Sequence, residues 1–418
     1  MNARCLAFAF LCCQAWTAAL AQTALPQEAY VWQRHWTPEL RVAITNHAPS
    51  FSGYVALAME IAWRRGQPEI IRVPIDFATL RASGKPIGLA LRIGPFPGPF
   101  LADDATARFL RERAAEVVGE ARAAGVIPRE LQIDFDCATA KLSGYQTWVE
   151  TLRQKIAPVP LIITVLPAWL PQPEFRSLAA AADGFILQVH SLDRPQHWES
   201  QFTLCDPVAA RKAVAAAARL GLPFRVALPT YGYHVAFDGA GQFLGLSAEG
   251  PARSWPPGAR VREVRSDAPA LAGLVRDWVA AAPPHLQGII WYRLPISLDA
   301  LNWPWPTLQA VMEGRVPQEH WRVERRPSMT ELVEIELQND GEMELTRFPI
   351  IDLAWHGARL VASDGLQGYA AGSAGPDHLT LRPQADRPGR ALSPGGKQTV
   401  GWLRFDRKAE VNIESNLP

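Results

Sequence analysis

The chain has 418 residues, of which 48% are hydrophobic and 20% are charged, and its formal net charge is +1. This length suits one large and one small domain, and the near-neutral charge argues against a protein that binds nucleic acid or an anionic membrane surface. The 15 tryptophans suit stacking on a ligand, although a tryptophan-rich core is the more common reason for such a number.

The first 21 residues have the pattern of a secretory signal peptide. Arg4 supplies a positive start, residues 5–16 are apolar, and Ala19-Leu20-Ala21 forms a small-x-small cleavage site before Gln22. The apolar stretch is too short to span a membrane, and no later stretch has the roughly eighteen apolar residues that a spanning helix needs. We therefore expect an exported protein, periplasmic or extracellular, with no membrane span.

Removal of the signal peptide leaves two cysteines, Cys137 and Cys205. One ends a predicted strand and the other lies in a loop between a later strand and its helix, so both are expected at the same end of the fold. In an oxidising compartment they could pair, and a disulfide and two buried free thiols both remain open. No CxxC or HExxH spacing occurs after the signal peptide, so we expect no metal site and no cofactor.

Eight short apolar stretches predict eight strands, over residues 30–34, 54–61, 87–93, 131–137, 161–166, 184–189, 224–228 and 288–292. Such strands are typical of a parallel sheet that is buried on both faces. Helical patterns between them cover residues 103–124, 145–156, 206–220, 268–281 and 305–313, and residues 70–75 suit an extra strand. This alternation predicts an α/β fold, a (β/α)8 TIM barrel, over residues 22–318.

The pattern changes in the last hundred residues. Alternating stretches predict strands over residues 331–337, 345–353, 378–381 and 399–405, with turns rich in Gly, Asp and Pro between them. No helical pattern is present there. We therefore expect residues 319–418 to form a small β-sandwich domain that gives structural support or contacts a glycan.

The fourth predicted strand carries two carboxylates, Asp134 and Asp136. Successive side chains of a strand point to opposite faces, so these two share one face while Ile133 and Phe135 share the other. Two neighbouring carboxylates on a buried strand repel each other and lose hydration, so they are seldom kept for stability alone. This pair is the leading candidate for a functional site.

Catalytic groups of TIM barrels lie at the C-terminal ends of the strands. The predicted strand ends here carry polar or aromatic side chains at nearly every position. They are Gln33, Arg34, Glu60, Arg92, Asp134, Asp136, Gln188, His190, Tyr231, Tyr233, Trp291 and Arg293.

These stretches resemble the chitinase-like family 18 of glycoside hydrolases. The aspartate pair resembles the catalytic fourth strand of that family, residues 229–232 (Pro-Thr-Tyr-Gly) resemble its seventh strand, and Gly288–Trp291 resembles its eighth, whose tryptophan floors the sugar subsite. The resemblance covers most of the barrel. The whole chain also looks similar to a bacterial family of exported barrel proteins of unknown function.

The resemblance implies a barrel that acts on a polysaccharide or oligosaccharide. Asp134 and Asp136 match the second and third aspartates of the family's pattern, whereas Leu131 stands at the first aspartate and Ala138 at the glutamate that donates the proton. Because leaving-group protonation needs an acid, chitinase activity requires a donor from elsewhere.

Three hypotheses follow. In the first, the protein is a glycosidase in which Asp136 or Asp134 acts as nucleophile or electrostatic stabiliser, and Glu60 or His190 donates the proton. In the second, the barrel binds a glycan without cleaving it, through stacking aromatic rings and polar groups; the candidates are Trp169, Tyr231, Trp291, Asp136 and Arg293. In the third, Asp134 is ion-paired to Arg92 for structural reasons, and the barrel face binds a protein partner.

Overall fold

The structure is a computed structural model that describes residues 25–191, 193–248, 254–327, 331–372, 375–384 and 390–417. The predicted signal peptide lies outside these ranges. Within them, no helix has the length and apolar character needed to cross a membrane.

Eight parallel strands close into a barrel. In order around it they are β1 (Gln27–Val31), β2 (Gly53–Arg64), β4 (Ile87–Ile93), β5 (Glu130–Phe135), β6 (Leu161–Val165), β7 (Phe185–Gln188), β8 (Phe224–Pro229) and β12 (Leu286–Tyr292), which pairs with β1 again. The predicted TIM barrel is confirmed. The strand β3 (Gln67–Arg72) lies antiparallel to β2 as an exposed hairpin, close to the extra strand predicted over residues 70–75.

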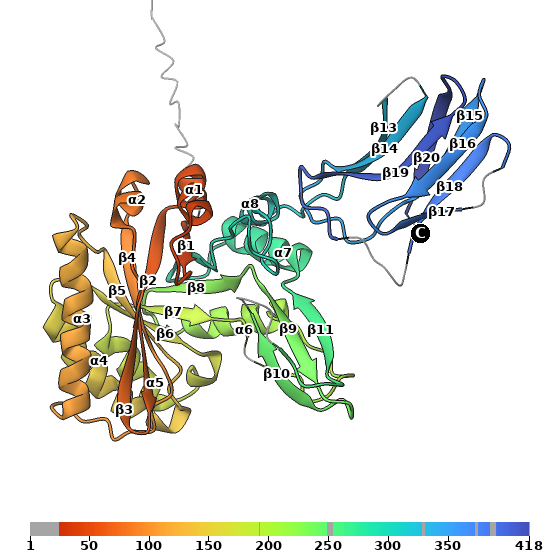
Figure 1. The fold of residues 1–418 in the computed structure, drawn as a ribbon. Helices are drawn as coiled ribbons and strands as arrows, with labels where there is room; N and C mark the ends of the chain where they lie inside the picture. Colours follow the sequence, from red (N-terminus) through yellow and green to blue (C-terminus); the bar gives the residue numbers. More distant parts are fainter. Residues whose placement is uncertain are drawn as a thin grey trace, which may run out of the picture.

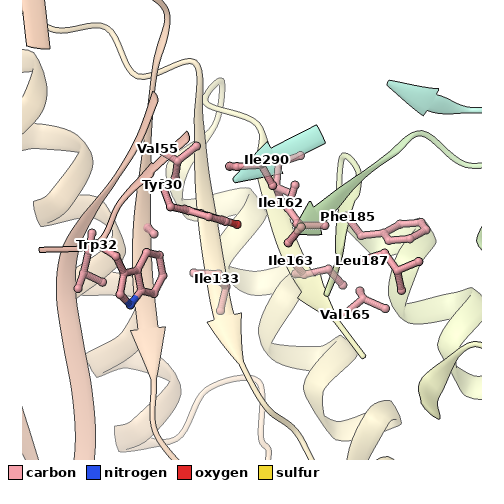
Figure 2. Packing of buried hydrophobic residues seen from close by; sticks show 14 of the residues in the cluster. Tyr30, Trp32, Val55, Ile133, Ile162, Ile163, Val165, Phe185, Leu187 and Ile290 are labelled. Atoms are coloured by element: carbon pink, nitrogen blue, oxygen red, sulfur yellow. The ribbon is translucent and has the colours of Figure 1, made fainter. Parts of the chain in front are cut away.

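The strands pack outward against helices (Figure 1). These helices are α1 (Pro38–His47), α2 (Phe77–Ala82), α3 (Ala105–Ala123), α4 (Leu142–Ile156), α5 (Pro173–Ala181), α6 (Pro207–Ala218), α7 (Ala268–Ala280) and α8 (Trp305–Met312). Asp104, Asp206 and Asp267 cap α3, α6 and α7, since each carboxylate accepts hydrogen bonds from backbone N–H groups of the first turn. Ile133, Ile163, Val165 and Leu187 belong to the continuous core of the barrel (Figure 2).

The first strand differs from the prediction. β1 spans Gln27–Val31 rather than residues 30–34, so Gln33 and Arg34 follow the strand instead of ending it. The apolar run misled the prediction because it continues into Trp32, which is buried after the strand has ended. The short helices α1, α2 and α5 were also not predicted.

An antiparallel sheet is inserted between β8 and α7. It consists of β9 (Gly232–Phe237) between β10 (Phe243–Ser247) and β11 (Arg260–Arg265), and it was not predicted. Leu204, Tyr231, Tyr233, Val235 and Phe237 form its own small core. This insertion lies at one side of the barrel, to the lower right in Figure 1.

The C-terminal part is all-β, as predicted. One sheet has the order β13 (Trp321–Pro327), β14 (Leu332–Asn339), β19 (Lys397–Phe405), β16 (Leu360–Gly365). The other has the order β17 (Tyr369–Ala371), β18 (His378–Pro383), β15 (Ile350–His356), β20 (Glu410–Asn416). The two sheets enclose a separate hydrophobic core, and the predicted boundary at residues 318 and 319 falls between α8 and β13.

Candidate functional site

An open pocket of about 890 Å³ lies at the C-terminal ends of the barrel strands. Most of the residues predicted from the strand ends line it together: Arg34, Glu60, Arg92, Asp134, Asp136, Gln188, His190, Tyr231, Tyr233 and Arg293. Gln33 lines it as well and donates to the Leu294 carbonyl at 2.9 Å. The barrel therefore brings side chains from most of its strands to one concave surface, the usual place for a ligand in this fold.

The two predicted stacking tryptophans lie elsewhere. Trp169 is buried against Tyr145 and Phe175, and Trp291 is buried outside the pocket, where its Nε1 donates to Gln27 at 2.9 Å. Neither is placed to stack on a sugar. Side chains alternate along β12, so the next residue, Tyr292, points into the pocket instead.

Cys137 and Cys205 are both buried free thiols. Of the two states that the sequence left open, the structure therefore has the unpaired one. Burial raises the pKa of each thiol to about 12. Both are thus inert thiols rather than nucleophiles.

Asp134 lies deep in the pocket and is held by few polar groups. Its Oδ1 accepts a hydrogen bond from Thr164 at 2.9 Å, and its Oδ2 lies 3.7 Å from the Arg92 Nε. Burial and the neighbouring Asp136 charge raise the pKa of Asp134 to about 6, although Arg92 and the Thr164 hydrogen bond oppose the rise. This carboxyl therefore exchanges its proton in a mildly acidic range, unlike an ordinary aspartate.

Asp136 lies just beyond β5, at the mouth of the pocket. It is exposed and has no hydrogen bond or ion pair among the described residues. Ala138, which matches the family's proton donor, is exposed outside the pocket lining, because the strand has already ended at Phe135. Asp136 is thus the last carboxyl that β5 brings to the pocket.

Glu60 is held by arginines. Arg34 donates to its two oxygens at 2.6 and 2.8 Å, and the Arg92 Nη1 lies 3.8 Å away. Glu60 pairs with Arg92, and Arg92 pairs with Asp134, in the register of three adjacent strands. Arg92 is therefore placed between the carboxylates of Glu60 and Asp134. Its ion pair with Asp134 is the one expected under the third hypothesis.

His190 is a poor candidate for the proton donor. It is buried, its Nδ1 lies 3.2 Å from the Tyr231 hydroxyl, and its ring stacks on Tyr292. Burial lowers the pKa of His190 to about 3. The imidazole is thus neutral at the pH values where a glycosidase works, so it does not carry the proton that a general acid needs.

Sequence reasoning missed several lining residues. They are Tyr30, Trp32, His35, Thr37, Thr164, Ser191, Asp193 and Tyr292, together with Leu246, Ser247 and Ala248 of the inserted sheet. Tyr30, Trp32 and Tyr292 form an edge-to-face aromatic cluster with ring centroids 5.1–5.8 Å apart. The aromatic residues of 30–32 were a usable signal, but the misplaced first strand hid them.

Arg293 forms an ion pair within its own loop. Its Nη2 lies 2.5 Å from Asp299 Oδ1, and the side chain is buried, so its charge is balanced by Asp299 rather than by the aspartate pair. Within the described ranges, no group of three or more His, Cys, Asp or Glu side chains is arranged to hold a metal ion.

Comparison with known proteins places this fold beside chitinases. A family model described as a domain of unknown function (DUF3142) matches residues 94–297, whereas a search of curated proteins finds no match. The C-terminal domain of a chitinase candidate from Desulfitobacterium hafniense is 11% identical and has a TM-score of 0.50; the match covers 69% of this chain and 99% of that one.

Two further similar structures are enzymes. A chitinase from Chromobacterium violaceum is 16% identical, with a TM-score of 0.48 and coverage of 70% of this chain and 98% of that one. The spore cortex-lytic enzyme SleL from Bacillus megaterium is 12% identical, with a TM-score of 0.49 and coverage of 70% and 74%. At 11% identity, the likeness to the Desulfitobacterium hafniense domain concerns the fold of the barrel alone.

Proposed function

We propose that the protein is an exported glycoside hydrolase whose acid is supplied by the pair Asp134 and Asp136. The observation that carries this proposal is the position of the pair in the pocket, with the pKa of Asp134 raised to about 6. Two interacting carboxyls that differ in environment are the usual source of one acid and one base at the same pH.

The two other candidate donors are less suited to the task. His190 is neutral at working pH, and both oxygens of Glu60 already accept hydrogen bonds from Arg34. Because Asp134 and Asp136 interact, the proton belongs to the pair rather than to one residue. Asp136 faces the open mouth and contacts the substrate, while Asp134 stabilises the protonated state of the pair from below.

The pocket surface suits a sugar polymer. The rings of Trp32 and Tyr292 supply apolar faces, and Arg92, Tyr233 and Gln188 supply hydrogen-bonding groups around them. Pyranose rings present the same alternation of apolar C–H faces and hydroxyl edges. Because the signal-peptide pattern indicates export, we expect the protein to encounter this polymer in the periplasm or outside the cell.

The first test is release of reducing ends from a panel of bacterial polysaccharides and chitin. We compare the protein beginning at Gln22 with Asp136→Asn and with a surface control, Asp277→Asn on α7. Turnover that falls at least a hundredfold in Asp136→Asn but not in the control supports the glycosidase, since one general acid contributes about 10²–10⁴ in rate.

A binding barrel is the second candidate, because Ala138 stands at the family's donor position. It predicts no turnover by any variant, together with quenching of tryptophan fluorescence by one glycan of the panel. That result would reject the hydrolase. Absence of both turnover and glycan binding would favour the third hypothesis, a surface for a protein partner.

A further inference from the structure

A buried ionic network lies beneath the pocket, inside the barrel. Arg225 donates to Glu28 and, at 2.6 Å, to Glu130, while Arg129 donates to Glu28 at 2.6 Å. Glu28, Glu130 and Arg225 are all less than 10% exposed. Burial opposes ionisation of Glu130, but Arg225 and Arg129 outweigh it and hold the pKa of Glu130 below its usual range.

The network fixes the direction of two further hydrogen bonds. Gln132 Nε2 donates to Glu130 Oε1 at 2.6 Å, and the Tyr30 hydroxyl donates to Gln132 Oε1 at 2.6 Å. A guanidinium only donates and a carboxylate only accepts, so the Gln132 amide must turn its NH2 to Glu130 and its carbonyl to Tyr30. The single hydroxyl proton of Tyr30 is therefore committed to Gln132.

Tyr30 and Asp134 both belong to the pocket lining, and Gln132 and Asp134 share the inner face of β5. The Tyr30 hydroxyl, 2.6 Å from Gln132 Oε1, therefore lies next to the side chain that neighbours Asp134 on this face, and after burial the Asp134 charge is the largest cause that raises the pKa of Tyr30. The structure gives no hydrogen bond from Tyr30 to Asp134 in its described part. Away from Gln132, the Tyr30 oxygen therefore presents only lone pairs and no proton.

We propose that Tyr30 and Gln132 are positioning residues for the acid: the network withholds the Tyr30 proton from Asp134, and this favours the protonated carboxyl. A carboxylate is stabilised by each hydrogen bond it accepts, and this arrangement denies it one. The proposal deepens the proposed function and rests on it for its catalytic meaning. The protonation state itself is independent of turnover.

Five other side chains interact with the charge of Asp134. Arg92 on β4 and Thr164 on β6 favour its charged form, whereas Asp136 after β5 and Glu60 on β2 oppose it. Tyr145 on α4 also interacts with its charge. A substitution at Gln132 leaves all of them in place, so a shift that it causes reports on the Tyr30 proton.

The test follows Asp134 directly by 13C NMR of protein labelled at the aspartate side-chain carboxyl, with Asp134→Asn to assign the signal. In Gln132→Met, Tyr30 loses its acceptor and is free to donate to Asp134. We expect the titration midpoint of Asp134 to fall by about one pH unit, a tenfold change in proton affinity. In the double variant Tyr30→Phe/Gln132→Met, the Asp134 midpoint should equal that of Tyr30→Phe alone, because the donor is absent from both.

The single variant Tyr30→Phe provides a second test that leaves the ionic network intact. The proposal expects an Asp134 midpoint that stays or falls, because no donated hydrogen bond is lost. A rise would show that Tyr30 donates to Asp134 in the native protein and would overturn the proposal, as would an unchanged midpoint in folded Gln132→Met. Absence of turnover with the expected midpoints would reject the glycosidase alone.

Discussion

Asp134 and Asp136 are separated by one residue, yet their surroundings differ sharply. Asp134 is largely enclosed and accepts one hydrogen bond from Thr164, while Asp136 is exposed at the pocket mouth. The sequence predicted that both share one face of a strand, which needs only the alternation of side chains. It could not predict their unequal exposure, because that depends on where β5 ends and on what Arg92 and Thr164 contribute from neighbouring strands.

The raised pKa of Asp134 predicts the pH dependence of activity. The pair serves as an acid only while it holds a proton, so kcat/KM should fall tenfold per pH unit once the pH rises above about 6. The pH profile of reducing-end release checks this. A constant rate from pH 5 to pH 9 would exclude the pair as the acid.

The same shift predicts a stability change. The folded protein binds the Asp134 proton more tightly than the unfolded chain, so the contribution of Asp134 is most favourable below pH 4 and is lost as the pH rises through about 6. In Asp134→Asn the side chain is neutral at every pH, so this loss of stability at higher pH does not occur. The substitution should therefore raise the free energy of unfolding at pH 7.5 by about 3 kcal/mol, with little gain at pH 4.

Urea unfolding at both pH values measures this difference, with Asp277→Asn on α7 as the control for loss of an exposed aspartate. A variant that is less stable than the wild type at pH 7.5 would contradict the environment described for Asp134.

At the scale of elements, most barrel strands could be predicted because they are apolar on both faces. β4 and β6 begin at the predicted residues, and α3, α6 and α7 carry aspartate caps that mark their starts. The predicted end of β12 was also correct, but the tryptophan was assigned to the wrong face. Burial along β12 is complete at both Ile290 and Trp291, so the apolar pattern holds no signal for which of them faces inward.

The ionic network inside the barrel could not be predicted either. Glu28, the adjacent pair Arg129 and Glu130, and Arg225 come from three distant parts of the sequence, and each residue alone looks like a surface residue. Only the closure of β12 onto β1 brings Glu28 to Arg225, and the carboxyl groups then offset the charge of the buried guanidinium.

Breaking this network should be costly. Arg225→Met leaves Glu28 and Glu130 buried with one fewer partner each, so we expect a loss of about 3–5 kcal/mol in the free energy of unfolding. Arg211→Met is the matched control, since its ion pair with Asp277 has a similar length of 2.6 Å but is solvent-exposed and should contribute less than about 1 kcal/mol. Similar losses in both variants, measured by urea unfolding, would argue against a buried network.

At the scale of the whole molecule, the all-β part was predictable as a class but its contacts with the barrel were not. Arg315 donates to both oxygens of Glu342 at 2.6 and 2.8 Å, and Arg265 on β11 donates to Glu344 at 2.5 Å. Thr307 on α8 also donates to the Glu342 backbone carbonyl. These links join α8 and the inserted sheet to the loop between β14 and β15.

The double variant Glu342→Gln/Glu344→Gln should loosen this junction. Each partly exposed ion pair contributes up to about 1 kcal/mol, so unfolding of the C-terminal domain should separate from that of the barrel in differential scanning calorimetry. The control is Glu410→Gln, whose pair with His356 lies within the C-terminal domain. A thermogram identical to that of the wild type would show that the junction depends on other contacts.

The strand β11 has two neighbours of different kinds. Along its length it pairs with β9, which carries Tyr233 of the pocket wall, and near its end Arg265 binds the C-terminal domain. The wall and the appended domain therefore share a single backbone segment. A surface that binds the C-terminal domain would therefore also determine how the pocket is oriented relative to that surface.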